Sequence, residues 1–140
     1  MASILKVDTI TGVSTAGSIA VTGEGNSTTT NLQQGLAKAW ISYNMNSSSS
    51  IYDSLNFASL TDNGTGDATV TATNNLSNAN FAQVDGTGDE GSQFNNSRAL
   101  ATATSGRKST AGTRFDTGGE SVNAAYDFIE NDILIHGDLA

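Results

Sequence analysis

Strict alternation of side chains over residues 37–43 is the feature that most constrains the fold. Apolar residues occupy one side of this segment and mixed residues the other: Ala37, Ala39, Ile41 and Tyr43 against Lys38, Trp40 and Ser42. A period of two predicts a β-strand with one buried face. The single tryptophan, Trp40, shares the mixed face with Lys38. We expect Trp40 to be a core or interface aromatic, with subunit contact or glycan stacking as the alternative.

The rest of the chain also favours short strands. Ser, Thr, Asn and Gly supply 64 of the 140 residues, and these types favour turns and edges over helices. Further strand candidates recur at intervals of roughly eight to twelve residues, as in sandwiches. They lie at 51–61, 68–74, 81–84, 98–104, 114–116, 121–128 and 133–136. The apolar run at 133–135 predicts a strand buried on both faces. The sequence thus predicts an all-β fold, an antiparallel β-sandwich or jelly-roll-like domain, over residues 32–140.

Residues 1–31 are predicted to be an N-terminal extended arm followed by a polar spacer. Two short strands are expected, Ile4–Val7 and Ser18–Val21, with the spacer at 22–31. An isolated strand pair is marginally stable in water, so the arm is expected to pair with a sister subunit or another protein. The apolar side chains expected to make this contact are Ile4, Leu5, Val7, Ile10, Ile19 and Val21.

The charge and composition exclude several classes of function. A formal charge of −8 and a pI near 4.2 argue against binding nucleic-acid phosphates. The absence of cysteine removes disulfides, thiolate metal sites and cysteine nucleophiles. The sequence predicts neither a secretory signal nor a membrane-spanning run, so we expect assembly in a cytoplasm without membrane insertion. The apolar content of 36% is modest, which favours oligomerisation.

Motifs for cofactor or metal binding are weak. Gly86, Gly88 and Gly91 match G-x-G-x-x-G, but no helix is predicted after them, so a turn is favoured over a dinucleotide site. The acidic residues of the turns fit no calcium-loop spacing, and polar turns are again favoured. These residues are Asp62, Asp67, Asp85, Asp89 and Glu90. We expect no cofactor and no metal.

Few residues have the chemistry needed for catalysis or recognition. His136 is the only histidine, and no serine lies in a nucleophile motif, so no catalytic residues are expected. Four of the six basic residues lie between positions 98 and 114, and we interpret them as a solvated loop. The alternative is contact with an anionic glycan or an acidic neighbouring subunit. These residues are Arg98, Arg107, Lys108 and Arg114.

Four segments resemble small virion proteins of tailed phages, notably phages of marine bacteria and cyanobacteria. They are ASILKVDTITG, NLQQGLAKAWISYN, DSLNFASLTDNGTGDATVTATNNLSNANFAQV and ILIHGD. The resemblance covers most of the chain and weakens between residues 86 and 120. It implies an assembly role in the virion, with the tail-fibre kind of β domain, and no known catalytic residues.

Three functional hypotheses follow. The first is a tail-fibre or tail-associated attachment module, expected to be a homotrimer, that contacts other virion proteins through its arm and a host surface glycan through its β domain. The second is a capsid decoration (cement) protein whose arm clamps the head lattice. The third, an enzyme that degrades glycans, is disfavoured because no paired carboxylates can be placed from the sequence.

Overall fold

The computed structural model describes residues 5–12, 19–22, 29–88, 97–99, 107–119 and 124–140. The chain divides into two units, Met1–Leu36 and Ala37–Ala140. The β domain was predicted to start at residue 32, whereas the division falls after Leu36. The intervening residues include the one-turn helix α1 (Leu32–Gly35). Among the described residues, no helix has the length and apolar character needed to cross a bilayer.

The first unit contains a short hairpin. Strand β1 (Ala20–Thr22) pairs antiparallel with β2 (Thr29–Asn31), and the Leu32 amide donates to the Ile19 carbonyl at 2.8 Å. The end of the predicted polar spacer at 22–31 thus forms a strand, because Thr29–Asn31 gives β1 its hydrogen-bonding partner within the same chain.

The predicted first strand of the arm is not formed in its described part. Leu5–Val7 has no ladder of backbone hydrogen bonds, and Ile4 lies outside the described residues. The apolar side chains of the arm are largely exposed, with Leu5 at 81%, Val7 at 52%, Ile10 at 57% and Val21 at 51%. A strand needs a neighbour to satisfy its backbone groups, and Leu5–Val7 has none among the described residues.

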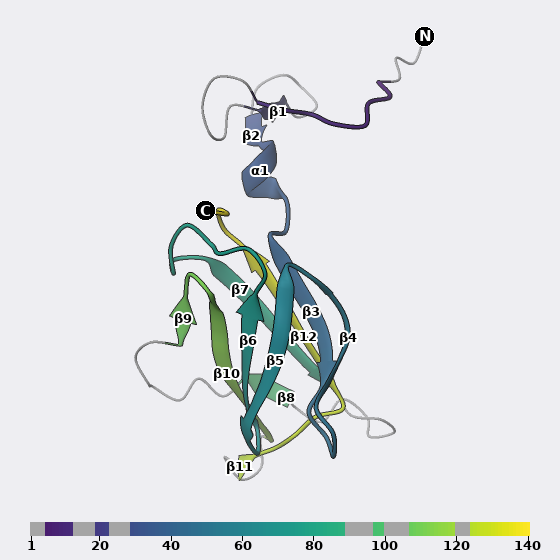
Figure 1. Cartoon of the computed structure of the whole chain (residues 1–140), viewed down its shortest axis with the longest axis vertical. Coiled ribbons are helices and arrows are strands. Elements are labelled where there is room, and N and C mark those ends of the chain that lie inside the picture. The colour runs from purple at the N-terminus through teal and green to yellow at the C-terminus, as the bar shows by residue number, and fades with distance from the viewer. Residues whose placement is uncertain (1–4, 13–18, 23–28, 89–96, 100–106, 120–123) are drawn as a thin grey trace. The chain divides into compact units, whose positions relative to one another are not determined.

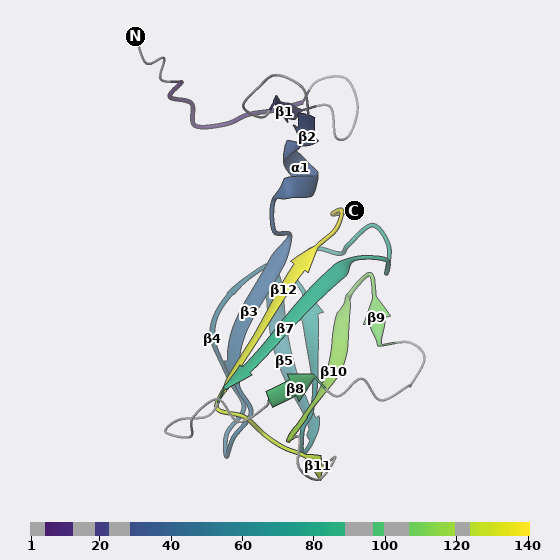
Figure 2. The same cartoon turned by 180° about the vertical axis from the view of Figure 1, so that it is seen from behind.

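The second unit is an all-β sandwich in which two antiparallel sheets face each other (Figure 1). One sheet has four strands in the order β4-β3-β12-β7. Their bounds are β3 (Ala39–Asn44), β4 (Ser50–Leu55), β7 (Ala82–Gly88) and β12 (Glu130–His136). Figure 2 shows this sheet in front, with β12 between β3 and β7. The predicted all-β fold class is confirmed.

The other sheet has six strands among the described residues. Its path is β11-β10-β6-β5, and β8 and β9 also pair with β10. The bounds are β5 (Phe57–Gly64), β6 (Asp67–Ala72), β8 (Ser97–Ala99), β9 (Lys108–Ser109), β10 (Gly112–Gly119) and β11 (Ala124–Ala125). The long strand β10 therefore pairs with four other strands of this sheet, β6, β8, β9 and β11.

Alternating side chains from both sheets build the core. Strand β3 buries Ala39, Ile41 and Tyr43, as the alternation predicted. Strand β6 buries Ala68, Val70 and Ala72 in the same manner. The other buried hydrophobic side chains are Met45, Phe57, Leu76, Phe81, Phe128, Ile133 and Ile135. One face of each central strand therefore makes the core.

Strand β12 is not buried on both faces, which corrects the prediction for residues 133–135. Ile133 and Ile135 are 2% and 0% exposed, but Leu134 between them is 36% exposed. No other described element of the second unit lies over the outer face of this sheet (Figure 2). The apolar character of Leu134 suggested burial that a two-layer sandwich does not provide.

The predicted strand at 121–128 is also wrong in its described part. Only Ala124–Ala125 forms a strand, and residues 121–123 lie outside the described residues. The chain then turns across the end of β10. The Thr117 hydroxyl donates to the Tyr126 carbonyl at 2.7 Å, and the Gly66 amide donates to the Asp127 carboxylate at 2.6 Å. These bonds anchor the segment that leads into β12.

Candidate binding face

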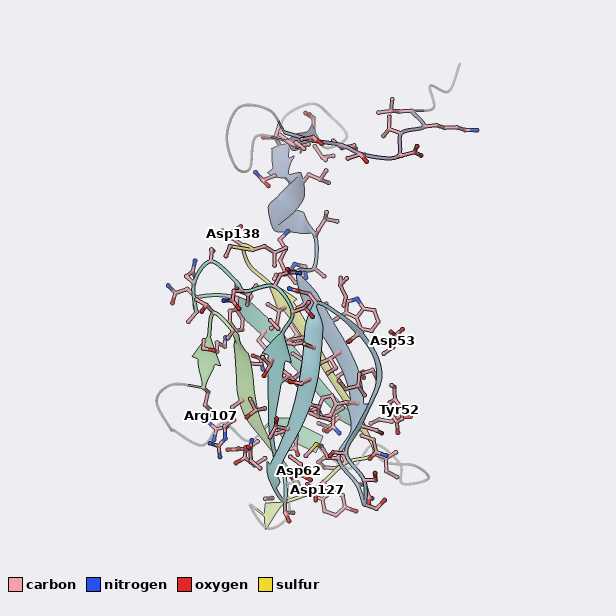
Figure 3. All side chains as sticks on the ribbon, viewed as in Figure 1. Tyr52, Asp53, Asp62, Arg107, Asp127 and Asp138 are labelled. Carbon is pink, nitrogen blue, oxygen red and sulfur yellow. The ribbon has the colours of Figure 1, made fainter. Side chains whose placement is uncertain are left out.

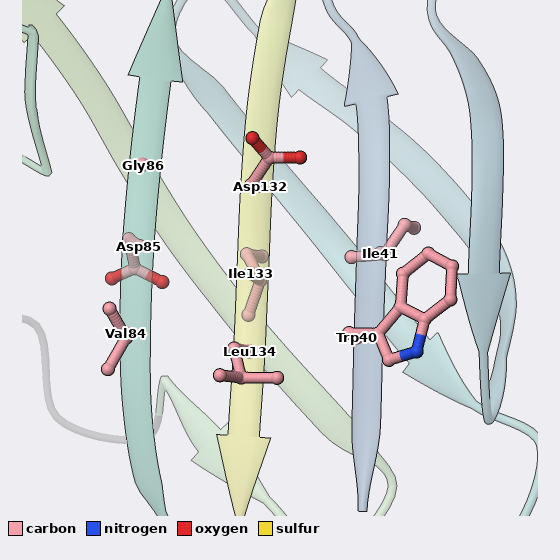
Figure 4. A pocket seen from close by; sticks show the side chains of 8 residues that line it. All are labelled: Trp40, Ile41, Val84, Asp85, Gly86, Asp132, Ile133 and Leu134. Carbon is pink, nitrogen blue, oxygen red and sulfur yellow. The ribbon is translucent and has the colours of Figure 1, made fainter. Parts of the chain in front are cut away.

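A row of apolar side chains crosses the outer face of the four-stranded sheet. In the strand register, Leu55 lies opposite Trp40, Trp40 opposite Leu134, and Leu134 opposite Val84. Leu55 is 47% and Val84 64% exposed, and Trp40 is half-buried. Figure 4 shows three of these side chains at one level across adjacent strands. We call these four residues the apolar row.

An acidic row lies directly beside it. Two residues further along each strand, the register places Asp53, Ser42, Asp132 and Gly86 opposite one another. Two residues in a strand advance by about 6.8 Å, so the two rows are close neighbours on one face. Figure 4 shows the Asp132 carboxylate one level from Leu134. Glu130, exposed opposite Gly88, adds a third carboxylate to this part of the face.

A shallow pocket of about 310 Å³ lies where the two rows meet. Trp40, Leu134 and Val84 line it from the apolar row, and Asp132 and Gly86 from the acidic row. Gly86 leaves this space open, because an added Cβ atom there would meet only the Asp132 Cβ, at 4.0 Å. A mostly apolar pocket with a few polar groups is the usual form of a ligand site.

Behind the pocket, a chain of polar side chains links the two sheets. The Thr113 hydroxyl donates to Gln83 at 3.0 Å, and the Gln83 amide donates to the Asp85 carboxylate at 2.6 Å. Burial raises the pKa of Asp85, although the Gln83 hydrogen bond opposes this change. Burial and the nearby Asp85 and Asp132 carboxylates raise the pKa of Tyr43. The Thr113–Gln83 hydrogen bond thus joins β10 to β7 across the sandwich.

The predicted basic cluster belongs to the other sheet. Arg114 forms a bidentate ion pair with Asp67, in which Nε donates to Oδ1 at 2.8 Å and Nη2 donates to Oδ2. This hydrogen bond lowers the pKa of Asp67 and raises that of Arg114. Arg107 pairs with Asp116.

The remaining members of that cluster are also placed there. Lys108 donates to the Phe81 carbonyl at 3.0 Å and lies 4.9 Å from the centre of the Phe81 ring. Arg98 lies in β8, and its side chain is outside the described residues. Figure 3 shows Arg107 and Asp53 on opposite sides of the second unit. The structure therefore does not bring the basic cluster together with Lys38 and Trp40.

The structure also locates the glycine motif and the acidic turn residues. Gly86 and Gly88 lie inside β7 rather than in the predicted turn, and Gly91 is outside the described residues. Within the described ranges, no group of three or more His, Asp or Glu side chains is arranged to hold a metal ion. Asp62 accepts from the Gly64 amide at 2.9 Å, as expected for a polar turn. Asp89 and Glu90 are not described.

His136 and Lys38 lie next to the apolar row, on the side away from the acidic row. His136 lies opposite Ala82 at the end of β12, on the same side as Leu134. The Lys38 amide donates to the Ile135 carbonyl at 2.9 Å, which extends the pairing of β3 with β12. Alternation then places Lys38 on the side of Trp40, as predicted. Trp40 is not part of the buried core.

Sequence reasoning found Trp40 but missed its partners. Leu55, Val84 and Leu134 come from segments far apart in the chain, and only the strand register aligns them. The sequence has a local signal at Val84, an apolar residue between the polar Gln83 and Asp85, but none at Leu134, which lies between two isoleucines.

The fold and this face define an all-β sandwich with an open, acid-flanked apolar surface. No protein-family model, no curated protein and no solved structure matches the chain.

Proposed function

We propose that this chain is a structural protein of a phage virion, a tail-fibre-like attachment module that joins the particle through its N-terminal arm. The observation that carries the proposal is the contrast between the two units. The second unit has its own core, whereas Leu5, Val7 and Ile10 of the first unit are more than half exposed. The resemblance of the sequence to virion proteins of tailed phages agrees with this assignment.

The exposed arm favours assembly for an energetic reason. Full burial of one large apolar side chain stabilises a complex by about 1.5–3 kcal/mol. Several such side chains in one short segment therefore represent substantial binding free energy that the first unit does not use. A sister subunit or another virion protein with an apolar groove would recover it. Threefold self-association through the arm is the assembly we propose, with the β-sandwich presented to the host surface.

The proposed role is binding rather than catalysis. The outer sheet face offers a ring, aliphatic side chains and carboxylate acceptors, which suit recognition of a surface. The other location open to such a module is the capsid, where the arm would clamp neighbouring head subunits as a decoration protein does.

The first experiment replaces the apolar side chains of the arm. The triple variant Leu5→Ser, Val7→Ser, Ile10→Ser is expected to keep the thermal unfolding temperature of the β-sandwich and to be lost from purified virions. A matched control, Lys6→Gln with Thr9→Ser, changes exposed polar residues of the same segment and is expected to be incorporated normally. Equal incorporation of both variants would contradict the role of the arm.

The second experiment locates the chain by cryo-electron microscopy of the whole virion. Density at the tail fibres, with the β-sandwich outermost, would support attachment. Density across the head lattice would assign the decoration role instead, and absence of the chain from the particle would refute a virion function altogether. Light scattering of the purified protein tests the trimer, and a monomer at micromolar concentration would count against it.

A further inference from the structure

We infer that the pocket between the apolar and acidic rows binds a glycan whose sugars carry no negative charge. This inference names the ligand class for the attachment role proposed above and depends on that role for its biological setting. From sequence alone, the basic residues between positions 98 and 114 were interpreted as a solvated loop, with contact to an anionic glycan among the alternatives. The arrangement of the side chains points to the opposite class.

The apolar row suits the face of a pyranose ring. A sugar ring presents C–H groups on its faces and hydroxyl groups around its edge. Trp40 offers a flat apolar surface, and Leu134 and Val84 continue it across the next two strands (Figure 4). Aromatic side chains that combine an apolar body with a polar atom are favoured where one side of a ligand is apolar and the other hydrated.

The acidic row suits the hydroxyl edge of the same ring. A carboxylate is purely an acceptor and takes hydrogen bonds from hydroxyl donors. Hydrogen bonds to a charged acceptor are also the stronger kind. Asp132 lies on the strand of Leu134, two residues away, and lines the pocket. A ring resting on the apolar row therefore has its edge beside this carboxylate.

The same carboxylates exclude acidic sugars. Asp53, Asp132 and Glu130 lie on this face, and the whole chain has a formal charge of −8. Alternation also places Lys38 on this face, so among its described residues three carboxylates stand against one ammonium group. A uronate or sulfate group in the pocket would be placed among like charges, which raises the energy of the complex. Arg107 and Arg114 do not offset this, since they pair with Asp116 and Asp67 in the other sheet. Lys108 lies nearer, because it donates to the Phe81 carbonyl just before β7 and its charge opposes the rise in the pKa of Asp85. It leaves the excess of carboxylates on the outer face unchanged.

The pocket size also favours a glycan over a protein partner. Its volume of about 310 Å³ is at the lower end for small-ligand sites. The exposed apolar surface is a single row with charged rows beside it, whereas stable protein interfaces bury roughly 800 Å² on each partner around an apolar centre. One or two sugar residues match the row better than a second sandwich does.

The test is a binding assay on the full chain with defined polysaccharides. The probes are a neutral β-glucan oligosaccharide, a chitosan oligosaccharide with amino sugars, and alginate as the anionic control. We expect binding to at least one of the first two and none to alginate. Trp40→Ala is expected to weaken that binding at least about tenfold, as for a central aromatic anchor. The control Tyr126→Ala removes an aromatic ring that is 45% exposed on the segment after β11, and should leave affinity unchanged.

A second variant guards against misfolding of the tryptophan variant. Gly86→Val fills the open side of the pocket with a β-branched residue that suits a strand, and its Cβ has room. It should fold normally by circular dichroism and lose glycan binding. Binding to alginate alone, binding that survives both Trp40→Ala and Gly86→Val, or no binding to either non-acidic probe would each overturn the inference. A chain located on the virion that fails these assays would leave the virion role intact.

Discussion

Gly112 and Gly64 form a matched pair that tests how closely the two neighbouring strands β6 and β10 must approach. Both glycines have a positive φ, +148° at Gly112 and +134° at Gly64. A Cβ atom at Gly112 would lie 2.1 Å from the Val70 carbonyl oxygen, whereas one at Gly64 would meet nothing within 4 Å. The two positions therefore have similar positive φ values and differ in the space around them.

The expected costs follow from this difference. Gly64→Ala is expected to lower the free energy of unfolding by about 1–3 kcal/mol, the cost of a conformation that side chains rarely adopt. Gly112→Ala adds a clash with backbone that cannot rotate away, so roughly a further 1–3 kcal/mol is expected. The second value is a large share of the 5–15 kcal/mol typical of a domain.

Urea unfolding of the two variants and the unchanged protein, followed by circular dichroism, measures both costs. The midpoint should shift further for Gly112→Ala at an unchanged slope of free energy against urea concentration. Equal destabilisation would refute the argument, because it would mean that the steric contact with Val70 has no cost beyond backbone strain. A larger loss for Gly64→Ala would refute it more directly.

Three further predictions concern the sheets. Ile135→Ala should lower the free energy of unfolding by about 2–5 kcal/mol, and the neighbouring Leu134→Ala by less than about 1 kcal/mol, in thermal or urea unfolding; similar losses would contradict the one-faced burial of β12. Asp67→Asn should destabilise the fold at neutral pH, because it removes the ion pair with Arg114 that lowers the pKa of Asp67. The stabilisation from this pair is present above the ordinary carboxyl pKa of about 3.9 and is lost as pH falls below it. Thermal unfolding at pH 7 should therefore show a larger effect of the substitution than thermal unfolding at pH 2.5. Asp85→Asn should stabilise the fold at pH 7, because burial raises the pKa of Asp85 and penalises its charged form in the folded state. The gain in the free energy of unfolding should shrink as pH falls through the raised pKa toward about 3.9. A gain that does not depend on pH would refute this cause.

The elements with a clear periodic signal were predictable. The alternation at 37–43 gave the strand and its buried face, because Ala39, Ile41 and Tyr43 differ sharply from their neighbours. Predictions failed where the polarity of a residue does not match its surroundings in the fold. Leu134 is apolar yet lies on an outer face, and Thr29–Asn31 is polar yet pairs with β1.

The candidate site was predictable only in part. Trp40 and Lys38 could be assigned to one face of a strand from local alternation. The apolar row needed the register of four strands whose contributing residues span positions 40 to 134. Register depends on long-range pairing and on bulges, such as the shift between Ser42 and Tyr43, and neither is encoded in local periodicity.

That same bulge has a consequence for how crowded copies of the chain behave. Strand β4 ends the four-stranded sheet, and a regular edge strand is a template for uncontrolled pairing with another molecule. Here Tyr52 is skipped in the pairing between β3 and β4, and Asp53 beside it is exposed. The irregular backbone and the charge make this edge a poor template. Edge-to-edge pairing of two copies through β4 is therefore disfavoured.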